Sequence, residues 1–430
     1  MTGGTRDAER LDLTIERPVV GGAMLARHQG RVVLVEGAIP GERVRARVDR
    51  ERRDVVYATT EEIIEPHPAR RVVEGDSACG GQVYRHIEYS HQLGLKADVL
   101  RDGLRRIARF DLPSPVPVAA SRETGYRMRA RLRVGPAGLG FLRQGTHAVC
   151  DATETGQLLP TSGEVVAELG RRVCRERRRL AYVDLAESLA SDQRVVHLRL
   201  RRRVPDKTLF DWTSGLAVTG VTATHADNRA VDTVTGIPTV ADPISTLLEG
   251  SGAPGQLVRH APSFYQSNRY LLPALVSAVH RRVRGSVLDL YAGVGAFSVT
   301  LAARGAQRVT AVERDTSAVA DLQSNATAVS ECLTVEPVAV EDYLARQSDL
   351  EDAETVIVDP PRIGLGREVV DRLGVLGARR LVYVSCDVAT FARDVRRFID
   401  LGYALDDDDI EAFDMFPNTA HIELVATLTR

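Results

Sequence analysis

One cysteine near the end of the chain has the setting of a nucleophile. Cys386 directly follows the apolar run Arg380-Leu-Val-Tyr-Val-Ser385, which has the composition of a buried strand. A thiol at the end of such a strand can attack an electrophilic carbon if its thiolate form is favoured. A lone cysteine is more often a small buried apolar residue. Spacing alone therefore leaves both interpretations of Cys386 open.

A carboxyl group farther along the chain has the setting of a proton acceptor. Glu423 lies in the apolar run Ile422-Glu-Leu-Val-Ala426. Burial in such a run raises the pKa of a carboxyl group towards neutrality, as acid–base catalysis at neutral pH requires. An exposed glutamate on a strand is the alternative, and the pattern does not distinguish the two.

A glycine-containing turn indicates a nucleotide-like ligand. The segment Asp289-Leu-Tyr-Ala-Gly-Val-Gly-Ala-Phe-Ser298 follows a predicted strand at 286–291 and opens a predicted helix at 297–304. Its two glycines let the backbone approach a ligand closely. Ser298 replaces the third glycine of the dinucleotide fingerprint, which argues against a bound pyrophosphate. Glu313, at the end of the next predicted strand, can accept hydrogen bonds from ribose hydroxyls. The pattern therefore favours S-adenosylmethionine over NAD.

Two further motifs follow neighbouring predicted strands. Asp359-Pro-Pro-Arg362 ends a strand predicted at 355–359, and Ser385-Cys386-Asp387 ends the strand predicted at 380–385. Ligands of open α/β sheets bind beyond the carboxyl ends of the strands. Both motifs are therefore expected at the same edge of one sheet.

The elements that must position these groups form three units. From residue 270 onward, predicted helices and strands alternate, which indicates a mostly parallel, doubly wound sheet of Rossmann-like type. Near the N-terminus, five short predicted strands are typical of a small OB-like β-barrel. Between them, strands are predicted at 125–134, 194–202, 207–213 and 216–222, and helices at 85–110 and 162–180. We expect an α/β multidomain protein with a tail (1–10), a barrel (11–66), a central α+β domain (67–255) whose helix 85–110 packs on the C-terminal domain, and that C-terminal domain (256–430).

Charge is unevenly distributed along the chain. Residues 67–150 carry 14 basic and 7 acidic side chains, although the whole chain has a formal net charge of −2. Within them, the two-residue period of a strand places four arginines on one face; these are Arg127, Arg129, Arg131 and Arg133. Such a face attracts a polyanion such as RNA, and a solvated strand face is the alternative. The arginines between 171 and 179 have helical spacing and are interpreted as a solvated helix face.

Composition excludes several classes of protein. No stretch approaches 18 consecutive apolar residues, so no membrane span is expected, and the N-terminal residues lack the apolar region of a secretory signal. The cysteines are odd in number and widely spaced, which predicts no disulfide framework and a reducing, cytoplasmic location. We expect a cytoplasmic monomer. The five cysteines are Cys79, Cys150, Cys174, Cys332 and Cys386.

Five motifs, in their order along the chain, closely resemble those of a known family. They are Ser263-Phe-Tyr-Gln-Ser-Asn268, Asp289-Leu-Tyr-Ala-Gly-Val-Gly295, Asp359-Pro-Pro-Arg-Ile-Gly364, Val384-Ser-Cys-Asp387 with Ala392-Arg-Asp394, and Asp414-Met-Phe-Pro417 with His421-Ile-Glu423. The set is similar to that of the S-adenosylmethionine-dependent RNA uracil-5 methyltransferases of bacterial tRNA and rRNA. The segments 21–27 and 37–43 look like the TRAM domain of that family, so the resemblance covers nearly the whole chain.

The resemblance implies a reaction and the residues that perform it. Cys386 would add to C6 of a uracil base, C5 would then take the methyl group, and Glu423 would remove the C5 proton. The target base must leave its stack to reach the cysteine, so base flipping in a tRNA or rRNA partner is implied. By the same resemblance, the residues that contact S-adenosylmethionine are Gln266, Tyr291, Glu313 and Asp359.

The chain departs from the family at an iron–sulfur site. Many members hold a cluster on four cysteines, three of them in a Cys-x5-Cys-Gly-Gly-Cys arrangement. Here Cys79 matches the second of the three, whereas Val73 and Gln82 replace its neighbours, and Thr155 or Gly156 stands near the fourth position. Fewer than four thiolates do not make such a site. We therefore expect no iron–sulfur cluster and no other metal.

Two other functions remain as alternatives. One is methylation of a target other than uracil, against which the combination of Asp359, Cys386 and Glu423 argues. The other is a non-catalytic RNA-binding or folding factor that keeps the cofactor fold. Retention of both Cys386 and Glu423 argues against that as well.

Overall fold

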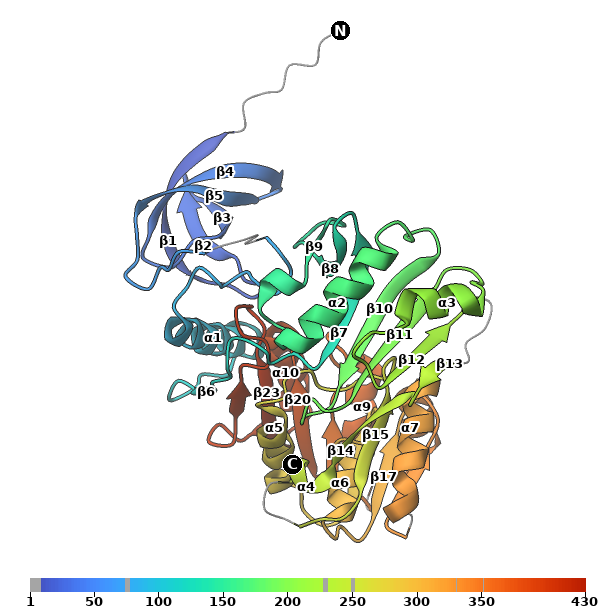
Figure 1. Cartoon of the computed structure of the whole chain (residues 1–430). Coiled ribbons are helices and arrows are strands. Elements are labelled where there is room, and N and C mark those ends of the chain that lie inside the picture. Colours follow the sequence, from blue (N-terminus) through green and yellow to red (C-terminus); the bar gives the residue numbers. More distant parts are fainter. Residues whose placement is uncertain (1–8, 74–77, 227–230, 249–251, 330, 351) are drawn as a thin grey trace.

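The N-terminal part of the chain is a closed β-barrel (Figure 1). The computed structural model describes residues 9–73, 78–226, 231–248, 252–329, 331–350 and 352–430. The barrel strands pair in the order β1-β2-β3-β5-β4. Side chains alternate between interior and surface, and the apolar set fills the barrel. The strands are β1 (Arg10–Pro18), β2 (Met24–His28), β3 (Arg31–Glu36), β4 (Arg43–Arg52) and β5 (Val55–Glu65).

The C-terminal part is the predicted α/β sheet, and the fold class is confirmed. Its strands run in the order β18-β17-β16-β19-β20-β23-β22-β6, with β21 beside β23. The five strands from β18 to β20 are parallel, and β23 is antiparallel to β20. The strands are β16 (Val287–Leu290), β17 (Val309–Val312), β18 (Leu333–Glu336), β19 (Thr355–Val358), β20 (Arg380–Ser385), β21 (Ala404–Leu405), β22 (Glu411–Phe413), β23 (Glu423–Thr429) and β6 (Val118–Ala119).

Helices cover both faces of this sheet, which explains the apolar runs in the sequence. Successive residues of one strand belong to different cores: Leu381 and Tyr383 pack on one side, Val382 on the other. A strand buried on both faces must be apolar throughout, as parallel strands usually are. The helices are α5 (Leu272–Arg282), α6 (Ser298–Ala303), α7 (Thr316–Ala326), α8 (Val340–Arg346), α9 (Arg367–Val375) and α10 (Val388–Asp400).

The central part is a seven-stranded sheet with strand order β13-β12-β11-β10-β7-β8-β9. Helix α2 (Pro160–Val173) and helix α3 (Asp206–Thr213) pack on it, and a strand pair, β14 (Thr239–Pro243) with β15 (Gln256–His260), and helix α4 (Ile244–Leu247) lead into the C-terminal domain. The sheet strands are β7 (Arg129–Gly135), β8 (Gly138–Leu142), β9 (Val149–Asp151), β10 (Leu180–Glu187), β11 (Arg194–Leu200), β12 (Gly220–Thr224) and β13 (Asp232–Gly236).

The strand predicted at 207–213 is wrong, because this segment is helix α3. Its aromatic and β-branched residues favour a strand locally. However, Pro205 stands at the N-cap position and Asp206 opens the first turn, while the buried residues Leu209 and Trp212 are three apart. A proline before the helix, an acidic first turn and buried residues three apart are signals of a helix. Burial of this helical face outweighs the local preference for a strand.

Helix α1 (Tyr89–Gly103) joins the barrel to the C-terminal domain. A π-helical turn (Leu104–Ala108) follows it, and both pack against α10, where Leu100 and Leu104 share a core with Phe391. On the barrel side, the Arg17 side chain of β1 pairs with Asp102 at 2.8 Å. The helix therefore touches both parts at once. No helix in the described ranges is long and apolar enough to cross a membrane.

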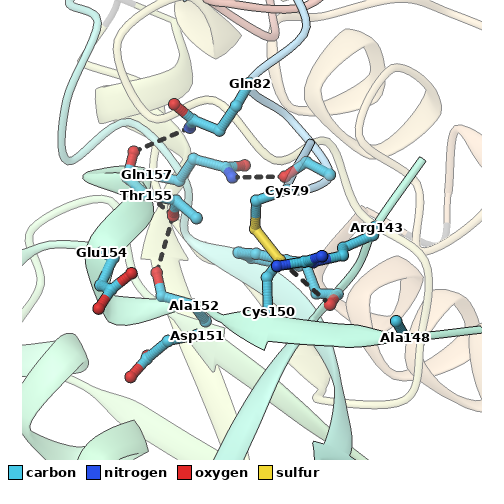
Figure 2. Close-up of a disulfide and its surroundings, with 12 residues drawn as sticks. Cys79, Gln82, Arg143, Ala148, Cys150, Asp151, Ala152, Glu154, Thr155 and Gln157 are labelled. Atoms are coloured by element: carbon cyan, nitrogen blue, oxygen red, sulfur yellow. Dashed lines mark hydrogen bonds between the residues drawn. A yellow bond between two sulfur atoms is a disulfide. The ribbon is translucent and has the colours of Figure 1, made fainter. Parts of the chain in front are cut away.

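A disulfide joins Cys79 to Cys150, so the expectation that the cysteines form none is wrong for this pair (Figure 2). Cys150 lies on the β8–β9 hairpin, and a bridge between Cys79 and Arg143 brings Cys79 beside it. The two cysteines are separated by 71 positions, and their Cα atoms are 5.6 Å apart. Beside it, the Gln82 side chain donates to the Thr155 carbonyl at 3.0 Å. The remaining three cysteines, Cys174, Cys332 and Cys386, are free thiols. The absence of a cluster stays a prediction.

Candidate active site

Cys386 and Glu423 occupy facing positions at one edge of the C-terminal sheet. Strand β20 ends at Ser385, whose partner in the antiparallel ladder is Leu424 of β23. Cys386 therefore comes directly after the last residue of β20 and Glu423 directly before that partner. Because β23 is antiparallel, its first residue lies at the carboxyl edge of the parallel strands. This topology brings the predicted nucleophile and the predicted proton acceptor to one place.

Asp359 lies at the same edge, directly after β19, which pairs with β20. A side-chain hydrogen bond joins it to Gln266, which is 7% exposed. Two residues assigned to the cofactor by resemblance are thus in direct contact. Arg362 follows on the same loop, and its positive charge favours the ionised forms of Cys386 and Glu423. No other part of the described chain donates a hydrogen bond to the Asp359 carboxylate.

Burial dominates the electrostatics of the two reacting groups. It raises the pKa of the Cys386 thiol to about 12, and the carboxyl groups of Glu423 and Asp359 add to the shift. Burial, followed by the neighbouring Asp359, also raises the pKa of Glu423 well above its ordinary value. Its Oε1 atom is buried and has no hydrogen-bond partner among the described residues. At neutral pH the protein alone therefore holds Cys386 as a thiol, while burial strengthens the hold of the Glu423 carboxylate on a proton.

A cleft of about 590 Å³ opens onto Cys386. Its lining includes Cys386, Arg362 and His421 from the C-terminal domain, together with residues of the central domain and the barrel. The pKa of His421 is lowered to about 4, mainly by burial, so this imidazole is neutral. The ring of Phe416 lies edge-on to it, with the ring centroids 6.1 Å apart. The cleft therefore offers an aromatic and polar wall to a planar base.

Arg127 extends into this cleft from the central domain. Its guanidinium donates to the Gln157 side chain at 2.7 Å and to the Arg129 carbonyl at 3.0 Å, and it stacks near the Phe141 and Phe416 rings. No carboxylate among the described residues pairs with it, so its charge is available to an anion in the cleft.

The other three arginines of the predicted face are held within the protein. Arg131 pairs with Asp184 at 2.8 Å. Arg129 and Arg133 donate to backbone carbonyls, of Ser263 at 3.1 Å and Ala181 at 3.4 Å respectively. The alternating arginines therefore make contacts within the protein, and Arg131 and Arg133 also line the cleft.

The predicted cofactor residues Tyr291 and Glu313 lie at the glycine turn after β16. Gly293 has a positive φ of 58°, and a Cβ there would meet only the Phe264 carbonyl oxygen, at 3.9 Å. Tyr291 adopts a φ of 64°, a strained value for an aromatic residue and one that often marks a ligand site. Glu313 accepts hydrogen bonds from the backbone N–H groups of Gly293 at 2.9 Å and Arg314 at 2.7 Å. The carboxylate thus ties the ends of two neighbouring strands to the turn.

Asp289 lies buried below this turn. Its Oδ2 accepts from the Ser298 backbone N–H at 3.1 Å, whereas its Oδ1 is buried and unpartnered among the described residues. Burial raises its pKa to about 7. Together with Asp359 and Glu313 it forms an acidic rim around a narrow glycine turn. These residues fit a ligand that has a ribose and carries positive charge, as S-adenosylmethionine does.

Several contacts that hold the site have no local signal in the sequence. Lys96 of α1 is 1% exposed and donates to Asp414 at 2.5 Å. Gln92, one turn earlier, accepts from the Asn418 backbone N–H at 3.0 Å. These two contacts fix the segment that leads to Glu423. The contact between Gln157 and Arg127 likewise has no signal in the sequence. For Lys96 the only signal is a weak one: lysine is rare in this arginine-rich chain.

Comparison with known proteins gives a consistent picture. A family model described as tRNA (Uracil-5-)-methyltransferase matches residues 260–430. The tRNA (uracil(54)-C(5))-methyltransferase of Pyrococcus horikoshii is 30% identical over 419 residues, covering 92% of this chain and 95% of that protein. The 23S rRNA (uracil(1939)-C(5))-methyltransferase RlmD of Halomonas elongata is 32% identical, covering 97% and 89% respectively.

A solved structure extends this similarity to the whole fold. The crystal structure of Pyrococcus abyssi tRNA (uracil-54, C5)-methyltransferase in complex with S-adenosyl-L-homocysteine has a TM-score of 0.75 and 28% identity. The alignment covers 97% of this chain and 99% of the archaeal one. The similarity therefore includes the barrel and the central domain as well as the residues matched by the family model. This chain belongs to the family of S-adenosylmethionine-dependent RNA uracil-C5 methyltransferases.

Proposed function

We propose that this enzyme methylates C5 of a uridine in tRNA or rRNA through a covalent bond between Cys386 and C6 of the base. The observation that carries the proposal is the facing of Cys386 and Glu423 across the β20–β23 ladder, where Cys386 lines a cleft that also contains Arg127 and Arg362. C5 of uracil is a weak nucleophile by itself. A nucleophile and a base on one side of the pyrimidine are what its activation requires.

Each reacting group has a defined role in the proposal. The Cys386 thiolate adds to C6, which gives C5 enolate character and lets it attack a methyl group. Glu423 then takes the C5 proton, and the bond between sulfur and C6 breaks to restore the aromatic base and the thiolate. S-adenosylmethionine supplies the methyl group on a positively charged sulfur. The raised pKa of Glu423 means that its carboxylate binds a proton more tightly than an exposed glutamate does, which supports its role as proton acceptor.

The cofactor is proposed to contact Gln266, Tyr291, Glu313 and Asp359. The support is their arrangement around the glycine turn: Glu313 accepts a hydrogen bond from Gly293 of the turn, and Gln266 is hydrogen-bonded to Asp359. The unpartnered Oδ1 of Asp289 beneath the turn adds a further buried carboxyl group, whose ionised form a cation would favour. A cationic ligand would compensate these charges. Because opposite charge favours ionisation, binding is expected to lower the pKa of each carboxyl group.

Methyl transfer to RNA tests the proposal. Unmodified tRNA and 23S rRNA transcripts are incubated with the enzyme and radiolabelled S-adenosylmethionine, and the nucleosides are separated. We expect labelled 5-methyluridine from the native enzyme, and a loss of at least about 10³-fold in Cys386→Ala, because the covalent route is removed. Cys332→Ala, which removes another free and partly buried thiol, is the matched control and should retain activity.

The Glu423→Gln variant separates the two steps of the proposal. It keeps the side-chain volume but cannot take the C5 proton. The methylated base should therefore stay attached to Cys386, and a protein–RNA band that resists denaturation should accumulate with ordinary RNA. Full release of 5-methyluridine by Glu423→Gln would show that another group removes the proton. Label appearing in a different nucleoside would reject uracil as the target.

A further inference from the structure

The edge of the central domain farthest from the barrel carries a group of cations without partners. Elsewhere on the surface, exposed arginines are commonly ion-paired, as Arg45 is with Asp12 and Glu62. By contrast, none of the described residues forms a side-chain hydrogen bond or ion pair with a set of exposed basic residues around the end of β11. The set is Arg175, Arg177, Arg178, Arg201, Arg202, Arg203 and Lys207.

Two turns bring these residues together. The spacing of these arginines predicts a helix face. However, α2 ends at Val173, so Arg175, Arg177 and Arg178 lie after the helix. The backbone N–H of Arg201 donates to the Arg179 carbonyl at 2.7 Å. The turn after α2 and the turn after β11 are therefore side by side. The positive charges of both turns add in one place.

A hollow lies next to this cationic group. It has a volume of about 620 Å³ and is lined by Arg203, Lys207 and Phe210 together with His225, Asp206 and Asp232, among others. Phe210 is a large apolar side chain that is 54% exposed. Its ring can stack on a planar ligand. The side-chain set combines a stacking surface, cations and hydrogen-bonding groups.

This hollow is separate from the catalytic cleft. It lies where α3 meets the ends of β12 and β13, and Figure 1 shows α3 and β13 at the side of the molecule away from the barrel. Strand β7, which begins at the cleft, is four places from β13 in the sheet. With strand spacings near 4.8 Å and a rise near 3.3 Å per residue, the two sites are roughly 20 Å apart. One folded RNA can span that distance.

We propose that this hollow, the α3 site, binds an unstacked nucleotide of the substrate RNA away from the target uridine. The base stacks on Phe210, and neighbouring phosphates contact Arg203, Lys207 and the cations of the two turns. Base stacking on an aromatic ring beside a positively charged groove is the general mode of single-stranded RNA binding. This inference depends on the proposed function in one respect, that the substrate is an RNA. It adds a contact that helps to select or orient that RNA.

Two variants test the proposal with unmodified tRNA transcripts as the probe. Phe210→Ala removes the stacking surface, and the triple change Arg201→Ala, Arg202→Ala and Arg203→Ala removes three phosphate contacts. We expect Phe210→Ala to weaken binding about tenfold. The triple variant should weaken it more, with a salt dependence shallower by about 2 to 3 in the log–log slope. In both, KM for the RNA should rise while kcat at saturating RNA is unchanged.

Matched controls lie on the C-terminal domain. Val375→Ala shortens another exposed apolar side chain, which is 74% exposed. The triple change Arg304→Ala, Arg346→Ala and Arg379→Ala removes three other exposed arginines and the same charge. These controls should bind RNA like the native enzyme. If the α3 variants match them in affinity, salt slope and KM, the proposal is wrong.

A spectroscopic readout makes the outcome independent of methyl transfer. Trp212 is the single tryptophan of the chain, lies two residues after Phe210 on α3 and is 6% exposed. Its emission should change as RNA saturates the native enzyme and the Cys386→Ala variant alike, and should not change in Phe210→Ala. An RNA complex that leaves Trp212 emission constant would overturn the α3 site while leaving the proposed catalytic function intact.

Discussion

At the level of single residues, the reaction depends on where protons reside before RNA binds. Cys386 lies between a buried glutamate and a partly buried aspartate, and these surroundings disfavour its thiolate. A thiolate is the reactive form of the residue. The positive charges near it, Arg362 on the same edge and those of bound ligands, must therefore offset the carboxyl groups. This electrostatic setting predicts a quiescent thiol in the protein alone.

Alkylation of Cys386 as a function of pH measures this directly. Because its pKa is about 12, the thiolate fraction rises about tenfold for each pH unit between pH 7 and pH 10. We expect the rate of modification by iodoacetamide to rise accordingly without levelling off, read by mass spectrometry of the peptide that contains Cys386. Cys174 in the same sample is an internal control for the reagent. A plateau below pH 8 would show a thiolate already stabilised in the protein alone.

At the level of elements, α1 holds the segment that leads to Glu423, the proposed proton acceptor. Its residues Lys96 and Gln92 reach Asp414 and Asn418, and its far end contacts the barrel through Asp102. The helix lies outside the residues matched by the family model, which begin at residue 260. Catalytic geometry therefore depends on an element of the central segment.

Substitution of Lys96 tests this dependence. Lys96→Ala leaves Asp414 buried without its cation and should lower the free energy of unfolding by about 3–5 kcal/mol in urea denaturation. Replacing both partners, Lys96→Met with Asp414→Leu, should recover most of it, since no charge stays buried. Arg101→Ala breaks a pair that is 49% exposed on both sides, and should change stability by at most about 1 kcal/mol. Equal effects of Lys96→Ala and Arg101→Ala would contradict the positioning role.

The parts of the fold that could be predicted are those with local signals. Apolar runs followed by glycine, Asp-Pro-Pro or Ser-Cys mark β16, β19 and β20, and their parallel order places the motifs on one edge. Contacts between distant residues had no such signal. Lys96 and Asp414 are 318 positions apart, and the disulfide partners are 71 apart. The α3 segment was not predictable because its residues favour a strand locally, whereas packing on the central sheet favours a helix.

At the level of the whole molecule, all three parts contribute to one cleft. Gly21 of the barrel, Arg127 of the central domain and Cys386 of the C-terminal domain line the same space. RNA entering this space would contact each part, and the α3 site extends the contact surface to the opposite edge. We propose that the C-terminal domain performs the chemistry, while the other parts select and orient the RNA. This selection is where tRNA and rRNA enzymes of the family must differ.

The most direct test of the central claim uses RNA that contains 5-fluorouridine. Fluorine at C5 cannot leave as a proton does, so the reaction should stop at the methylated adduct, with Cys386 bound to C6. We predict a protein–RNA complex stable in denaturing gels, and digestion with mass spectrometry should place the nucleotide on the peptide that contains Cys386. Cys332→Ala should form the complex as the native enzyme does. An adduct that survives in Cys386→Ala, or that maps to another residue, would contradict the account.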